Sequence, residues 1–122
     1  MCEQGPKPSN VEVFKNDSDY LRGDIAEELV NENTFFEKGS IQLLKHHGTY
    51  EQDDRDVRGQ LQEDGSKKRF IYMVRTRIPG GVLTSDQLLA ELDICDEVGN
   101  STLRITSRQA LQLHGVVKAD LR

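Results

Sequence analysis

The strongest constraint on this fold is the alternation of apolar and polar side chains in two separate segments of the chain. Over residues 69–78, aromatic and aliphatic side chains fall on one side of a strand, whereas Arg75 and Arg77 fall on the other. Residues 102–114 alternate in the same way, with a kink near Arg108. A period of two predicts strands that bury one face and leave a polar face on the other side.

A helix is predicted between these two segments, over residues 84–99. Thr84 or Ser85 can cap its start, and Gly99 suits its end. Its expected apolar face consists of Leu88, Leu89, Leu92 and Cys95. The order strand, helix, strand predicts an α+β fold with a βαβ unit over residues 69–117.

The N-terminal half of the chain has weaker patterns. We expect a loose tail over residues 1–16 and one helix over residues 18–31, in which Leu21, Ile25 and Leu29 form an apolar stripe. Residues 41–50 are a short apolar run that ends near a glycine, which favours a strand. Residues 51–68 are polar and predict a solvated, irregular loop, with one or two helical turns around Arg55 to Leu61.

Composition narrows the classes of protein to consider. The net charge of −5 and the sequence pI of about 5.2 argue against a nucleic-acid binder. No apolar run approaches the ~20 residues of a membrane span, and the first residues lack a secretory or transit pattern, so we expect a cytoplasmic protein with no membrane partner. Cys2 and Cys95 form no metal-ligand spacing, so we expect no metal site from this chain alone, and Cys95 as a small core side chain.

The polar face of the predicted sheet leaves two interpretations open. If the strands are neighbours, Arg75, Arg77, Arg104 and Arg108 share one side of the sheet, where they need water or an anion as a partner. One interpretation is a solvated face with weak surface ion pairs. The other is a site for a carboxylate or another oxyanion, which the guanidinium group binds through two hydrogen bonds.

Two smaller features also have alternative interpretations. His114 follows the same polar face and is either a structural histidine or a ligand. The segment YEQDDRDVR, residues 50–58, is either a self-neutralising surface segment or a paired-carboxylate acid/base site.

Four motifs in order resemble one known family. They are DYLRGDIAEEL, HHGTYEQDDRDVR, MVRTRIPGGVLT and LRITSRQALQLHG, which lie between residues 19 and 115, and the resemblance covers nearly the whole chain from about residue 11 onward. In order and spacing they resemble the N-terminal part of ferredoxin-type assimilatory sulfite reductases, within the siroheme-dependent sulfite and nitrite reductase family. Ser107 stands where we expect an asparagine, and Glu51 stands where a glutamine is common.

The resemblance implies a function and a set of cofactors. Members of the family reduce sulfite to sulfide with six electrons, using a siroheme and a 4Fe–4S cluster, and here ferredoxin is the expected donor. Siroheme is a polycarboxylate, which gives the polar face a ligand. The cysteines that hold the cluster are not among the cysteines of this chain, so we expect the remainder of a longer reductase to supply them and this chain alone to be inactive.

The resemblance also implies residue roles and a domain division. Arg75 resembles the arginine that binds sulfite. The residues that resemble siroheme contacts are Arg77, Arg104, Thr106, Ser107, Arg108, Gln112 and His114. Residues 1–66 are then an N-terminal tail and arm with one helix, and residues 67–122 the first, incomplete half of a ferredoxin-like nitrite/sulfite reductase domain. The alternatives are a nitrite reductase of the same family and a stand-alone ferredoxin-like module that binds an anion without catalysis.

Overall fold

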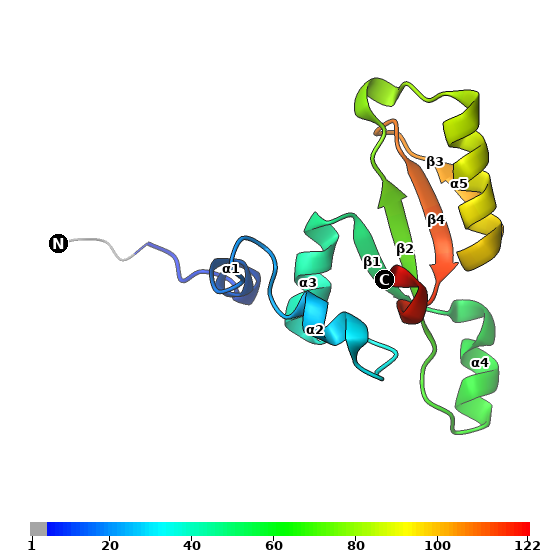
Figure 1. Ribbon diagram of the computed structural model, residues 1–122. Helices are drawn as coiled ribbons and strands as arrows, with labels where there is room; N and C mark the ends of the chain where they lie inside the picture. Colours follow the sequence, from blue (N-terminus) through cyan, green and yellow to red (C-terminus); the bar gives the residue numbers. More distant parts are fainter. Residues whose placement is uncertain (1–4) are drawn as a thin grey trace.

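The computed structural model describes residues 5–122 and contains one four-stranded antiparallel sheet (Figure 1). Its strands are β1 (Thr49–Asp53), β2 (Phe70–Thr76), β3 (Leu103–Ile105) and β4 (Leu111–Val116), in the spatial order β1-β2-β4-β3. Helix α5 (Ser85–Val98) connects β2 to β3, which run in the same direction because both are antiparallel to β4. With β4 between them, these elements form a split βαβ unit. The expected α+β fold is confirmed.

Helix α5 begins and ends as its sequence predicts. Thr84 Oγ1 accepts a hydrogen bond from the Gln87 backbone N–H at 3.2 Å, and Gln87 Oε1 accepts one from the Thr84 N–H at 2.9 Å. This reciprocal pair is a capping box. The helix stops at Gly99, whose N–H donates to the Cys95 carbonyl at 3.1 Å.

The core lies on one face of the sheet. Helices α2 (Ile25–Val30), α3 (Lys38–His46) and α5 all contribute to it or flank it. Its buried members are Phe36, Leu44, Tyr72, Cys95, Leu113 and Val116. Cys95 is only 2% exposed, which confirms it as a small core side chain, and burial raises the pKa of its thiol.

The prediction that Leu88, Leu89, Leu92 and Cys95 form a buried apolar face of α5 is wrong except at Cys95. Leu88, Leu89 and Leu92 are 39%, 57% and 41% exposed. The helix has 14 residues and is therefore about 21 Å long, whereas β3 has three residues and covers only ~10 Å. The edge strand is too short to cover the whole helix, so the sheet buries only the helix end that carries Cys95.

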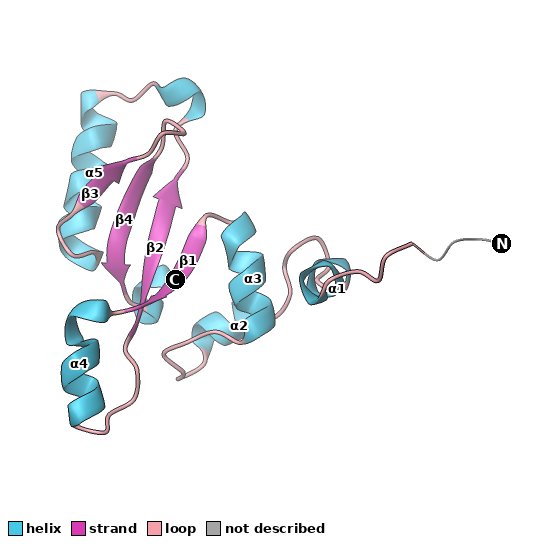
Figure 2. Ribbon diagram, turned by 180° about the vertical axis from the view of Figure 1, so that it is seen from behind, coloured by secondary structure: helices cyan, strands magenta, loops and turns pink. Residues whose placement is uncertain are grey.

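The described part of the N-terminal arm, from residue 5 onward, holds four helices and not the single helix expected. Helix α1 (Asn10–Asn16) replaces part of the predicted loose tail and begins at Ser9, whose Oγ accepts from the Glu12 N–H. Both views show α1 apart from the sheet (Figure 2). Residues 1–4, including Cys2, lie outside the described residues.

The helix predicted over residues 18–31 is wrong over its first turns, because only Ile25–Val30 is helical there. Asp19, Tyr20 and Leu21 have φ values of 49°, 60° and 68°, in the left-handed region that side chains rarely adopt. Ser18 stabilises this turn, since its hydroxyl donates to the Lys15 carbonyl at 2.6 Å and accepts from the Leu21 N–H at 3.0 Å.

The strand predicted over residues 41–50 is also wrong. Residues 38–46 form α3, and the strand β1 starts only at Thr49, after Gly48 ends the helix with φ of 81°. The segment 51–68 is not irregular throughout, because it contains the rest of β1 and helix α4 (Arg55–Glu63). The expected helical turns around Arg55 to Leu61 are confirmed within α4. No helix among the described residues is long and apolar enough to cross a membrane.

A bulge in β4 changes the register next to the polar face. Val74 pairs with Leu113 but Tyr72 pairs with Val116, so β4 contains one extra residue in this interval. Gly115 lies there with φ of 75°, and a Cβ on it would meet the Asn100 Cβ at 2.7 Å. The bulge therefore depends on glycine at this position.

We expect Gly115→Ala to lower the free energy of unfolding by about 2 kcal/mol, because alanine adds left-handed strain and a clash. Gly59→Ala is the matched control. Gly59 lies inside α4 with nothing within 4 Å of an added Cβ, so the same change there should stabilise the protein by roughly 0.5–1 kcal/mol. Urea unfolding of both variants measures the difference, and equal effects would contradict the role of the bulge.

Candidate anion-binding site

The two arginine-bearing strands meet on one face of the sheet, opposite the core. In the register of the sheet, Arg75 of β2 and Arg104 of β3 both pair with Gln112 of β4, which lies between them. Directly paired residues share a face, so these three side chains form one row across the sheet. This confirms that the two arginines lie on the same side.

A cleft of about 620 Å³ opens at one end of this row. We call it the basic cleft. Among the described residues its lining contains no Asp or Glu, and its lining residues are Lys45, His46, His47, Gly48, Tyr50, Arg75, Thr76, Arg77, Ile78, Arg108, Gln109 and Ala110. A concave surface that carries Lys45 and three arginines and no acidic side chain concentrates anions.

The arginines of this face have no carboxylate partner. The ion pairs among the described residues join Lys15 to Glu12, Arg58 to Asp53 and Arg69 to Asp54. Arg75, Arg77, Arg104 and Arg108 are absent from these pairs. The ion pairs of the first interpretation are therefore not found for these four arginines, which leaves water or an external anion as their partner.

Arg75 occupies the most restricted position in the basic cleft. Its guanidinium carbon lies 5.7 Å from the centre of the Tyr50 ring, within the range of a cation–π contact. Its backbone N–H donates to the Gly48 carbonyl at 2.8 Å, and its Nε is buried without a hydrogen-bond partner. A buried N–H without a partner is costly, so this group is available to a bound acceptor.

A second cleft of about 490 Å³ lies farther along the same face and has mixed charge. Arg104 and His114 line it together with the segment 52–58. In that segment Asp53 accepts an ion pair from Arg58 at 2.8 Å. The interpretation of residues 50–58 as a self-neutralising surface segment is confirmed for this pair.

His114 combines partial burial with a positive neighbour. Its Nε2 is buried without a partner, and burial, followed by the charge of Arg104, lowers its pKa below the usual value for histidine. The ring is therefore neutral at pH 7, when one ring nitrogen accepts and the other donates hydrogen bonds.

The lowered pKa of His114 predicts how stability depends on pH. Below about pH 6.5 the unfolded chain takes up a proton that the folded ring resists, so this contribution to stability is present above about 6.5 and is lost as the pH falls. We expect the wild-type protein to lose stability more steeply than His114→Gln between about pH 7 and 5. Urea unfolding across this range is the measurement, and parallel profiles would contradict the assignment.

The turn between β3 and β4 carries the other predicted contact residues. Thr106 Oγ1 accepts from the backbone N–H groups of Arg108 and Ala110 at 3.3 and 3.2 Å, so it shapes the turn. Ser107 and Arg108 are exposed, and only Arg108 reaches the lining of the basic cleft. Of the predicted site residues, Arg75, Arg77 and Arg108 line the basic cleft, and Arg104 and His114 line the second cleft. Gln112 lies in the row between the clefts, and Thr106 and Ser107 line neither of them.

Sequence patterns missed the arm's share of the basic cleft. Lys45, His46 and His47 end helix α3, and Tyr50 belongs to β1, which pairs with β2. His47 is fixed there by a 2.8 Å hydrogen bond between its Nε2 and the Leu21 carbonyl. These residues could have been predicted from a helix that ends in basic residues and is followed by glycine. Such an end places the basic side chains beside the next strand.

Among residues 5–122, His, Cys, Asp and Glu side chains form no group of three that could hold a metal ion.

The chain is similar to known proteins of one family. Residues 63–122 match the nitrite/sulfite reductase ferredoxin-like half domain. The chain is 48% identical over 119 residues to the sulfite reductase (NADPH) hemoprotein beta-component of Myxococcus xanthus. This match covers 96% of this chain and 21% of that protein. It is 45% identical over 116 residues to the sulfite reductase (ferredoxin) of Synechococcus elongatus, covering 95% of this chain and 18% of that protein.

A third relative extends the comparison to a eukaryote. The sulfite reductase (NADPH) subunit beta of Schizosaccharomyces pombe is 45% identical over 118 residues, covering 96% of this chain and 8% of that protein. The chain thus spans about a fifth or less of the length of these relatives. The match of residues 63–122 and the similarity of nearly the whole chain to sulfite reductases show that this chain belongs to the nitrite and sulfite reductase family.

Proposed function

We propose that this chain is the N-terminal segment of an assimilatory sulfite reductase, which reduces sulfite to sulfide with six electrons. The observation that carries the proposal is the row Arg75–Gln112–Arg104 beside a cleft without acidic side chains. The relatives are named sulfite reductases, which supports sulfite as the substrate. We propose residues 67–122 as the first half of the reductase domain, with residues 1–66 as its arm.

The polar face fits siroheme, a polycarboxylate cofactor. Unpaired arginines and the buried, unpartnered nitrogens of Arg75 and His114 are the groups that carboxylates would satisfy. The residues proposed to hold the cofactor are Arg77, Arg104, Thr106, Ser107, Arg108, Gln112 and His114. The cofactor, together with a 4Fe–4S cluster held by residues elsewhere in the protein, supplies the electron transfer.

Arg75 is proposed to bind the sulfite anion. The Tyr50 ring restricts its guanidinium group, so its donors are oriented before the anion arrives. Fixed donors aimed at an oxyanion stabilise charge that develops during the reaction, and they do so more strongly in a site that excludes water.

The electron donor is a separate part of the proposal. Ferredoxin, expected from the sequence, appears in the name of the Synechococcus elongatus relative, whereas NADPH appears in the names from Myxococcus xanthus and Schizosaccharomyces pombe. We propose ferredoxin as the donor. The test measures sulfite reduction by the intact enzyme with reduced ferredoxin and compares it with the rate obtained with NADPH and a flavoprotein. Turnover with the flavoprotein alone would overturn the ferredoxin assignment.

The cofactor role is tested by siroheme content. We expect Arg104→Ala in the intact enzyme to lower siroheme absorbance per chain, because this arginine has no carboxylate partner of its own. Arg58→Ala is the matched control, since that arginine lines the same cleft but is paired with Asp53. Normal siroheme content in Arg104→Ala would contradict its role and favour a module that binds another anion.

A further inference from the structure

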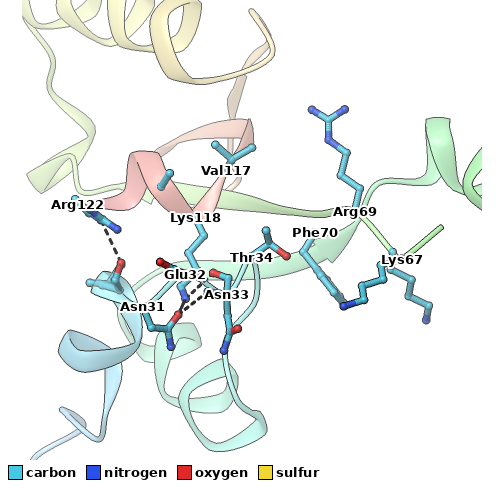
Figure 3. Close-up of a pocket in the computed structure, with 13 residues that line it drawn as sticks. Asn31, Glu32, Asn33, Thr34, Lys67, Arg69, Phe70, Val117, Lys118 and Arg122 are labelled. Carbon is cyan, nitrogen blue, oxygen red and sulfur yellow. Dashed lines mark hydrogen bonds between the residues drawn. The ribbon is translucent and has the colours of Figure 1, made fainter.

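A separate cavity of about 650 Å³ lies where the arm meets the other end of β2 (Figure 3). We call it the arm cavity. It is enclosed by residues 29–34, by residues 67–70 at the start of β2, and by residues 117–122. Phe70 and Arg75 are five residues apart on β2, or about 17 Å, so this cavity is distinct from the basic cleft. Its volume is within the usual range for small-molecule sites.

Lys118 places a buried ammonium group in the wall of the arm cavity. The residue is 4% exposed, and its Nζ donates to Asn31 Oδ1 at 2.6 Å and to the Asn33 carbonyl at 2.9 Å. Both acceptors are neutral, and among the described residues no carboxylate lies within ion-pair distance of this ammonium group. Glu28 and Glu51 act on this ammonium group only from beyond ion-pair distance, and the Phe36 ring centre lies 4.8 Å from it. An anion in the cavity would supply the direct counter-ion that the buried charge lacks.

Other cations surround the same cavity. Lys67 and Lys68 are exposed and form no ion pair among the described residues, and the Arg122 Nε donates only to the neutral carbonyl of Leu29 at 3.2 Å. The lining contains five Lys or Arg residues and one acidic residue, Glu32, a net charge of +4 in a chain of net charge −5. This charge complements an anion.

Part of the remaining lining is apolar and suits a hydrocarbon group. Leu29, Phe70 and Val117 are half-buried side chains in the wall, and the Phe70 ring packs against Phe35 at a centroid distance of 5.9 Å. We propose that the arm cavity binds a small amphipathic carboxylate, with its anionic group near Lys118 and Arg122 and its hydrocarbon body against Phe70 and Val117.

Titration with octanoate, followed by amide chemical shifts of the purified protein, tests the proposal. We expect shifts confined to residues 29–34, 67–70 and 117–122, with a Kd on the order of 1 mM, since a ligand of this size has limited affinity. Octanol and octylamine have a hydrocarbon chain of the same length but no carboxylate group, and each should bind at least about tenfold more weakly than octanoate. Equal binding of octanol, or shifts centred on the basic cleft, would overturn the proposal.

Charge-removing variants locate the anion. Lys67→Gln and Lys118→Met should each weaken octanoate binding several-fold, whereas Lys7→Gln, an exposed lysine outside the cavity, should leave it unchanged. Lys67→Gln keeps the test decisive if Lys118→Met loosens the arm, because Lys67 is exposed and makes no hydrogen bond to the arm. Unchanged affinity in Lys67→Gln together with Lys118→Met would refute the site.

Discussion

Replacing Arg75 with alanine in the intact enzyme is expected to lower sulfite turnover by about 100-fold, or roughly 3 kcal/mol, as does the loss of one oxyanion donor in other enzymes. The physical reason is the position of this guanidinium group. It is half-buried at the end of the arginine row, held over Tyr50, and its Nε has no partner within the described residues. Steady-state sulfite reduction with a reduced one-electron donor is the measurement.

Two further variants separate the substrate role of Arg75 from a cofactor role. Arg75→Ala should keep more siroheme per chain than Arg104→Ala or Arg108→Ala, because those arginines are proposed to hold cofactor carboxylates. Arg22→Ala, an exposed arginine outside both clefts, is the control for removing a positive charge. Near-normal turnover in Arg75→Ala would contradict the substrate role, and loss of siroheme as complete as in Arg104→Ala would move Arg75 to the cofactor.

Replacing Phe36 with alanine is expected to have the largest effect on stability, about 3–5 kcal/mol of the free energy of unfolding. Phe36 is 2% exposed, and its ring meets the Tyr72 ring edge-on at 5.6 Å, with the Lys118 ammonium 4.8 Å from the ring centre. Its backbone N–H also donates to Glu51 Oε2 at 3.2 Å. The side chain therefore joins the arm to the sheet.

Phe35→Ala provides a control at the adjacent position. Phe35 is 39% exposed, so the same truncation there should cost only about 1 kcal/mol. Urea unfolding followed by circular dichroism measures both variants. Equal losses would show that the arm is held by general apolar contact and not by insertion of Phe36 into the core.

A buried hydrogen-bonded pair supports the same junction between arm and sheet. The Tyr72 hydroxyl donates to Glu51 Oε2 at 2.6 Å, and burial, then Glu51, raises the pKa of Tyr72, which keeps the hydroxyl protonated. Glu28 has a similar role on α2, where its carboxylate accepts from the Glu37 N–H at 2.7 Å and from the Ser40 hydroxyl. Glu51 thus has a structural role as an acceptor for two donors.

The C-terminal half of the chain could be predicted because its signals are local. Alternation over 69–78 and 102–114 follows from the pleat of a strand, and the capping residues Thr84 and Gln87 act within one helical turn. The arm was predicted poorly because its conformation depends on distant contacts. The left-handed turn at residues 19–21 is held by Ser18 and by His47, 26 residues away from Leu21.

By itself, the sequence determined that Arg75 and Arg104 lie on polar faces of strands, since side chains alternate in every strand. Only the tertiary structure decided that both face Gln112, that Tyr50 and the end of α3 complete the basic cleft, and that Arg104 and His114 belong to a second cleft. Periodicity describes the direction of a side chain relative to its own strand. Which strands become neighbours, and in which register, is set by the burial of Tyr72, Leu113 and Phe36 in one core, which joins segments far apart in the chain.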